Sequence, residues 1–76
     1  MIPNRIYKIK TQESGLYPTP TSLKLERWLE LGEHFMFLEE GYSSAREFLN
    51  LKILHKLGVS YLYVRKNPDI FEEVEL

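Results

Sequence analysis

The sequence predicts a small domain built mainly of β-strands, and three observations support this fold class. Residues 49–53 and 61–65 alternate between apolar and polar side chains, which is the period of two expected of half-buried strands. Gly58 lies between these two runs and supplies a turn, so residues 48–66 are predicted to form a β-hairpin. Residues 34–39, HFMFLE, are apolar on both faces of an extended chain, as in a strand at the centre of a sheet.

Length and composition indicate one domain, residues 1–76, with one core. A chain of 76 residues buries only a modest share of its surface. Its 43% hydrophobic content, with five tyrosines, four phenylalanines and one tryptophan, is sufficient for a core and argues against intrinsic disorder. Because the chain has no cysteine, we expect neither disulfides nor thiolate metal sites.

The chain carries no sign of export or of a membrane segment. No stretch approaches the 18 continuous apolar residues of a spanning helix, and the start, MIPNRIYKIK, is charged where a signal peptide is apolar. We therefore expect a cytoplasmic protein without membrane contact.

The first part of the chain reads as a strand followed by a long loop. Residues 5–11, RIYKIKT, are rich in β-forming side chains. Residues 12–22, QESGLYPTPTS, collect a glycine and two prolines, so we expect them to leave the sheet as a loop. Tyr17 lies in this loop and is a candidate binding residue; the commoner alternative is that it folds back over the edge of the core.

Two segments allow both helix and strand. Residues 23–31 carry apolar side chains at helical spacing, but we prefer a strand that ends in a tight turn at residues 32–33. Ser44 and Glu47 have the spacing of a capping box that would start a helix over residues 48–57. A helical wheel scatters the apolar residues of that segment around the axis, so we predict a strand there.

The end of the chain is predicted to form a last, acidic strand. Pro68 lies in a turn, a short helical turn follows through Ile70, and residues 71–76 add a strand with Val74 and Leu76 inward. Carboxylates on an edge strand repel an identical edge, so we expect a monomer or a weak homo-oligomer that associates through the hairpin instead. These carboxylates are Glu72, Glu73 and Glu75.

The predicted order of elements resembles that of the small five-stranded SH3-like barrels. The order is carried by LELGEHFMFLEE, LKILHKLGVSYLYV and NPDIFEEV, and the resemblance covers residues 5–76. It concerns the fold alone, because the chain lacks the ALYDY-type loop signature and the paired tryptophans of the peptide-binding SH3 family. The resemblance implies a five-stranded barrel in which Tyr17 and Pro68 hold positions similar to those of groove residues.

The inventory of chemically reactive residues is thin. His34 and His55 are the only histidines, and neither has the spacing of a metal site or a catalytic triad. The carboxylate pairs 39–40 and 72–73 point to opposite faces of a strand, and the four glycines form no phosphate-binding loop. We expect no catalytic residue, no metal site, no cofactor and no enzymatic activity.

One set of outward side chains suggests a binding role. If Leu62 and Val64 face the core, then Tyr61, Tyr63 and Arg65 form a row on the outside of the hairpin. We expect a non-enzymatic interaction module that uses this row to bind, and to inhibit or recruit, a larger protein. The competing interpretation is ordinary packing, with the frame reversed or the row covered by the long loop. Compact cysteine-free domains of this kind are common among phage and mobile-element accessory proteins.

The alternative function is nucleic-acid binding by a small barrel. The tyrosines would stack bases while basic side chains hold phosphates. A formal net charge of −1 and the acidic middle and end of the chain count against this interpretation. The basic side chains concerned are Lys52, Lys56, Arg65 and Lys66.

Overall fold

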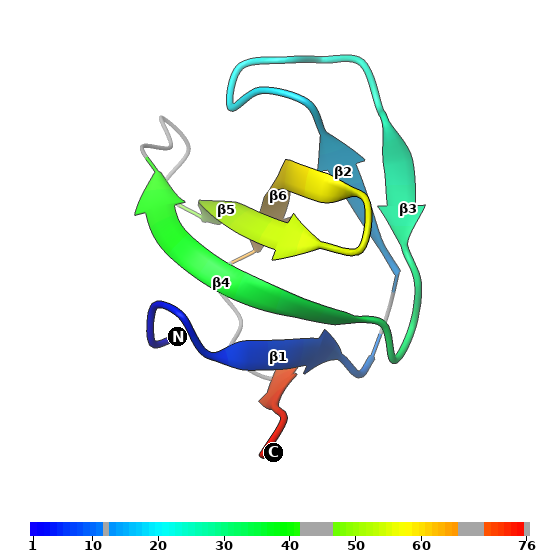
Figure 1. Ribbon diagram of the computed structural model, residues 1–76. Helices are drawn as coiled ribbons and strands as arrows, with labels where there is room; N and C mark the ends of the chain where they lie inside the picture. Colours follow the sequence, from blue (N-terminus) through cyan, green and yellow to red (C-terminus); the bar gives the residue numbers. More distant parts are fainter. Residues whose placement is uncertain (12, 42–46, 66–69, 76) are drawn as a thin grey trace.

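One antiparallel sheet dominates the computed structural model, which describes residues 1–11, 13–41, 47–65 and 70–75. Figure 1 shows the sheet curled into a half-barrel. The order across the sheet is β3-β2-β6-β5-β4-β1-β7, so β3 and β7 are its edges. The strands are β1 (Ile6–Ile9), β2 (Ser14–Tyr17), β3 (Arg27–Leu29), β4 (His34–Gly41), β5 (Phe48–His55), β6 (Gly58–Arg65) and β7 (Phe71–Glu73).

The sheet buries apolar side chains on one face, which we call the inner face; the opposite side is the outer face. Successive residues of a strand point to opposite faces, so each strand contributes alternate side chains to the core. The aromatic ring of Phe35 lies 5.5 Å from that of Phe71 and 6.3 Å from that of Tyr7. The buried cluster is Tyr7, Ile9, Leu16, Leu29, Phe35, Phe37, Leu51, Ile53, Leu62, Val64 and Ile70.

The strands β5 and β6 form the predicted hairpin at the middle of the sheet. They pair from Phe48 opposite Arg65 to His55 opposite Gly58. Gly58 has φ of 120°, a conformation that side-chain-bearing residues rarely adopt, which explains the glycine at this turn. The prediction of a strand rather than a helix after residue 47 is confirmed.

The predicted long loop over residues 12–22 is wrong in its first part, because Ser14–Tyr17 form β2. Leu16 is fully buried opposite Leu62 of β6, and this burial outweighs the weak strand propensity of the neighbouring glycine. The prolines follow the strand, so only the second part of the segment is a loop. The described residues therefore hold seven strands, where the resemblance to SH3-like barrels implied five.

Two further boundaries differ from the prediction. The strand expected over residues 23–31 is limited to β3, Arg27–Leu29, and the turn after it contains Gly32 with φ of 82°. The last strand, expected over residues 71–76, ends at Glu73, although the Val74 N–H still donates to the Ile6 carbonyl at 2.9 Å. The helical turn expected near Pro68 falls largely on residues 66–69, outside the described residues.

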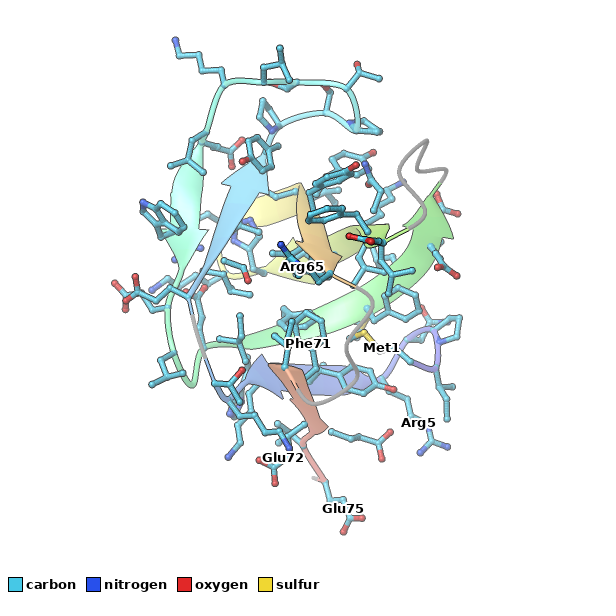
Figure 2. The ribbon with its side chains drawn as sticks, turned by 180° about the vertical axis from the view of Figure 1, so that it is seen from behind. Met1, Arg5, Arg65, Phe71, Glu72 and Glu75 are labelled. Carbon is cyan, nitrogen blue, oxygen red and sulfur yellow. The ribbon has the colours of Figure 1, made fainter. Side chains whose placement is uncertain are left out.

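The acidic edge strand β7 is paired with basic side chains of the β1 region. The Arg5 guanidinium lies 3.2 Å from the Glu73 carboxylate, and the Lys8 ammonium lies 3.7 Å from the Glu72 carboxylate. In Figure 2, Phe71 points toward the middle of the sheet while Glu72 and Glu75 lie at its lower edge. Within the described residues, no helix is long and apolar enough to cross a bilayer.

Candidate binding site

The pairing of β5 with β6 determines which hairpin side chains reach the outer face. Leu62 and Val64 are buried on the inner face, so Tyr61, Tyr63 and Arg65 point to the outer face, as the sequence predicted. Tyr63 is 41% exposed. The β5 residues paired with them point the same way; they are Lys52 opposite Tyr61, Asn50 opposite Tyr63 and Phe48 opposite Arg65.

Strand β2 adds a third tyrosine to this face. Tyr17 pairs with Tyr61 across the β2–β6 ladder, so the two side chains are cross-strand neighbours on the outer face. Tyr17 is thus held by a strand and not by a flexible loop, which corrects the position expected from the sequence. Three tyrosines from two strands are brought together: Tyr17, Tyr61 and Tyr63.

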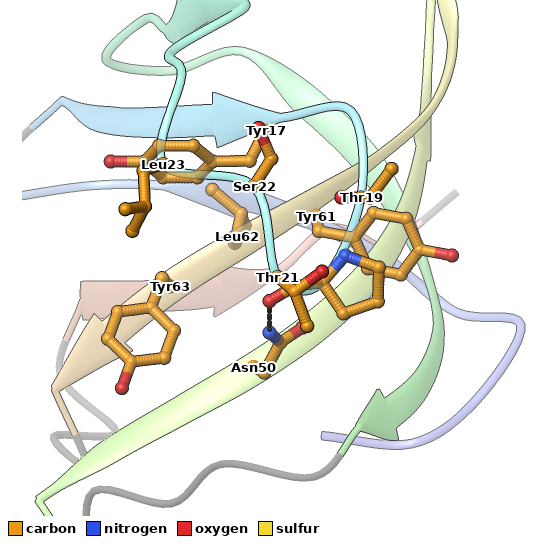
Figure 3. Close-up of a pocket in the computed structure, with 10 residues that line it drawn as sticks. Tyr17, Thr19, Thr21, Ser22, Leu23, Asn50, Tyr61, Leu62 and Tyr63 are labelled. Carbon is orange, nitrogen blue, oxygen red and sulfur yellow. Dashed lines mark hydrogen bonds between the residues drawn. The ribbon is translucent and has the colours of Figure 1, made fainter.

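The segment between β2 and β3 folds over these tyrosines and encloses a pocket of about 480 Å³ (Figure 3). The Asn50 Nδ2 donates to the Pro20 carbonyl at 3.0 Å, which ties the segment to β5. The Ser22 N–H donates to the Thr19 carbonyl at 3.3 Å and closes a turn above the sheet. The sheet side of the pocket consists of the three tyrosines and Asn50, together with Leu62, which lies between Tyr61 and Tyr63 on β6 and whose side chain is buried. The covering side consists of residues 19–23.

The lining of this pocket combines aromatic rings with neutral hydrogen-bonding groups. Hydroxyls of tyrosine, threonine and serine can both donate and accept hydrogen bonds. No lysine, arginine, histidine, aspartate or glutamate is among the described residues that line it. The pocket therefore suits an uncharged group, since burying a charge without a partner is costly.

Asn50 is the polar residue at the wall of the pocket. Its side chain is buried, and its Oδ1 lacks a hydrogen-bond partner, the one such buried side-chain atom in the part of the chain that the structure describes. An unsatisfied buried acceptor costs about 1–3 kcal/mol. Gly41 lies opposite Asn50 on β4, and a Cβ there would lie 3.5 Å from this Oδ1.

An aromatic stack with a cation lies next to the pocket. The rings of Phe48 and Tyr63 are 5.0 Å apart with an interplanar angle of 7°, and the Arg65 guanidinium lies 5.6 Å from the Phe48 ring centre. No carboxylate pairs with Arg65 among the described residues. Tyr63 is the member of this stack that lines the pocket, so the stack places a positive charge beside the pocket.

The remaining predicted site residues are less closely associated with the pocket. Lys52 adjoins Tyr61, but its ammonium also faces the Glu39 carboxylate at 4.0 Å. Lys56 is exposed at the hairpin turn, far along the strand from Tyr63. Pro68 and Lys66 lie outside the described residues.

A buried polar network at the other end of the hairpin is structural. The Leu57 N–H donates to His55 Nδ1 at 3.2 Å, so the imidazole proton resides on Nε2, which donates to Ser60 Oγ at 2.8 Å. The Ser60 hydroxyl in turn donates to the Glu26 carboxylate at 3.0 Å. His55 in this tautomer cannot accept the Ser60 proton, and Ser60 is fully buried, so the three residues do not form a nucleophilic triad.

An ion pair lies close to this network. The two guanidinium nitrogens of Arg27 bind the two carboxylate oxygens of Glu33 at 2.8 and 3.1 Å. Burial alone would raise the pKa of Glu33, but the hydrogen bonds from Arg27 and from the Glu30 N–H outweigh it and lower this pKa. Burial, aided by the positive charge of Arg27, lowers the pKa of His55.

The described residues contain no group of three or more histidine, aspartate or glutamate side chains placed to hold a metal ion. Neither a protein-family model, nor a curated protein, nor a solved structure matches the chain. The function must therefore be argued from the geometry of the site.

Sequence reasoning identified three of the ten residues that line the pocket, namely Tyr17, Tyr61 and Tyr63. In the sequence, Asn50 is an ordinary polar residue of an alternating strand, and no neighbouring residue indicates its contact with Pro20. Residues 19–22 were expected in a loop that leaves the sheet and Leu23 in a strand; instead they fold over the tyrosines, as in the competing interpretation in which the long loop covers the row.

Proposed function

We propose that this protein is a non-enzymatic interaction module that binds a larger protein through the outer-face pocket, and so recruits or inhibits that partner. One observation carries the proposal: Tyr17, Tyr61 and Tyr63 converge at the surface around a pocket of about 480 Å³. Tyrosine is enriched among the residues that dominate the energy of protein interfaces. A strand-mounted cluster also loses little conformational freedom on binding.

The composition of the site supports a protein partner. Tyrosines supply rigid contact area, while serine, threonine and asparagine supply adaptable hydrogen bonds, the combination used by antibody binding loops. Leu23, at the rim of the pocket, is 99% exposed, which leaves an apolar contact open to a partner.

Nucleic-acid binding is the second candidate, favoured by the stack of Phe48, Tyr63 and Arg65. Such a stack resembles the platforms on which single-stranded bases lie. The formal net charge of −1 weighs against it, and so does the proximity of Lys52 to Glu39, because phosphate binding needs several uncompensated cations.

Binding by variants of the pocket tests the first candidate. Partners captured on the immobilised protein would be purified, and their affinities measured by calorimetry for wild type, Tyr61→Ala and Tyr63→Ala. Truncation of a central tyrosine is expected to cost about 2 kcal/mol or more, which is roughly a thirtyfold loss of affinity. Leu57→Ala is the control, because Leu57 is exposed at the hairpin turn.

Equal capture by all of these variants would contradict the proposal. Titration with single-stranded RNA and DNA at low salt tests the second candidate, and a flat response would eliminate it. Binding that weakens steeply with salt and depends on Tyr63 would instead favour nucleic acid over protein.

Three further predictions about this protein are independent of the proposed binding site. The SH3-like character of the barrel, a phage or mobile-element origin and a cytoplasmic location all come from the sequence pattern alone. The proposed pocket does not depend on any of them.

A further inference from the structure

We infer that the pocket takes an extended peptide segment of the partner, with an uncharged apolar or aromatic side chain in the pocket and a carboxylate next to it on Arg65. This inference rests on the proposed function and specifies the chemistry of the partner. It follows from three properties of the site: a lining without charge, a row of neutral hydrogen-bonding groups and a cation beside the pocket.

The uncharged lining determines the side chain that enters. The wall of the pocket carries the rings of Tyr17 and Tyr61 and no charged side chain, so a charged side chain that entered would lose hydration without gaining an ion pair. An apolar or aromatic side chain has no charge whose hydration could be lost, and it gains contact area with the rings.

The polar groups of the pocket match a peptide backbone. An extended segment presents N–H donors and C=O acceptors at regular intervals. The hydroxyls of Thr19 and Thr21 can meet either kind, whereas the Ser22 hydroxyl is already bonded to the backbone of Lys24.

The position of Arg65 determines where the carboxylate lies. Arg65 follows Tyr63 by two residues and Tyr61 by four on the same face of β6. At about 3.3 Å per residue, this places the guanidinium about 7–13 Å along the strand from the tyrosines. A carboxylate about two to four residues from the entering side chain of an extended segment would reach it.

Charge favours a peptide over a nucleic acid as the occupant. A strand of nucleic acid brings one phosphate per nucleotide, whereas this face offers Arg65 and, opposite Tyr61, Lys52, which is already shared with Glu39. A single carboxylate is sufficient to pair with Arg65.

Selection of random peptides on the full-length protein tests this inference. A phage-displayed library of random 12-residue peptides would be selected on the immobilised wild type, and the recovered peptides mapped by ¹⁵N NMR. We expect a consensus with an uncharged apolar residue and an aspartate or glutamate two to four positions away. We also expect shifts of the amides of Tyr17, Tyr61 and Tyr63 and of the Asn50 side-chain amide.

Peptide and protein variants then test each contact. Replacing the consensus apolar residue by aspartate or lysine should weaken binding about tenfold or more. Arg65→Glu should weaken the acidic peptide about fivefold and restore binding of a peptide in which lysine replaces the carboxylate. Leu57→Ala should bind the original peptide like wild type.

Four outcomes would overturn the inference: a charged consensus residue at the pocket, peptide shifts that map to another surface, no effect of Arg65→Glu, or no enrichment of any peptide. If a single-stranded oligonucleotide displaced the peptide with a steep salt dependence, the occupant of the site would be a nucleic acid and not a peptide. If no peptide is enriched but partner capture still depends on Tyr61 and Tyr63, the peptide inference fails while the proposed function stands. If capture is independent of both tyrosines, the proposed function itself fails.

Discussion

Shortening Leu62 to alanine should destabilise the protein severely, because its side chain is 0% exposed at the centre of the sheet. The substitution removes three carbon atoms, and at about 0.8 kcal/mol per buried CH₂ the lost transfer energy is about 2.4 kcal/mol. The cavity left between Leu16 and Leu51 adds to this loss. We therefore expect the free energy of unfolding to fall by about 3–5 kcal/mol.

This loss is a large part of the total stability. At about 0.05–0.15 kcal/mol per residue, a chain of 76 residues has a free energy of unfolding of about 4–11 kcal/mol. A loss of about 3 kcal/mol lowers the midpoint of thermal unfolding by about 12–24 °C in a domain of this size. Urea denaturation followed by far-ultraviolet circular dichroism measures the change directly.

Leu57→Ala is the matched control, since it makes the same deletion at a position of the same hairpin that is 72% exposed. Its free energy of unfolding should change by less than about 0.5 kcal/mol. If the two variants lost equal stability, or if Leu62→Ala lost less than about 1 kcal/mol, the inward frame of β6 would be wrong. The placement of Tyr61 and Tyr63 on the outer face would then be wrong as well.

Three other perturbations have defined outcomes. His55 has a lowered pKa in the folded protein, so its contribution to stability is complete above the unfolded pKa of about 6.5 and is lost as the pH falls below that value. The urea midpoint should therefore be lower at pH 5.5 than at pH 7.5, and His55→Gln should reduce this difference. Gly58→Ala forces a side chain onto a backbone with φ of 120° and should cost about 1–3 kcal/mol in the same denaturation assay, with an unchanged value arguing against this turn. Replacing Glu73 and Glu75 by glutamine removes negative charge at the β7 edge of the sheet and should increase self-association at neutral pH, as measured by sedimentation velocity. If the variant stayed monomeric at all concentrations, these two charges would not be what prevents edge-to-edge pairing.

The parts of the fold that could be predicted are those in which local pattern and burial agree. The hairpin is the clearest case, because alternation over 49–53 and 61–65 coincides with the inner and outer faces and Gly58 marks the turn. β2 could not be recognised in this way, since it is four residues long and next to prolines. Its strand conformation depends on the burial of Leu16 against β6, a contact between residues far apart in the sequence.

The binding site, like the fold, could be predicted only where local pattern determines it. The row of Tyr61, Tyr63 and Arg65 follows from strand periodicity alone, but its union with Tyr17 requires the pairing of β2 with β6. The pocket also depends on the fold-back of residues 19–23, which is held by one hydrogen bond to Asn50 and has no periodic signature.

The hairpin separates core positions from surface positions by the parity of residue numbers. Along β6, the even positions Leu62 and Val64 belong to the core, while the odd positions Tyr61, Tyr63 and Arg65 belong to the outer face. Substitutions at the odd positions can therefore change what the surface binds while leaving the core packing in place. Strand β6 accordingly offers positions for diversification on a constant framework, whether by natural selection or in a library made to redirect the protein to a new partner.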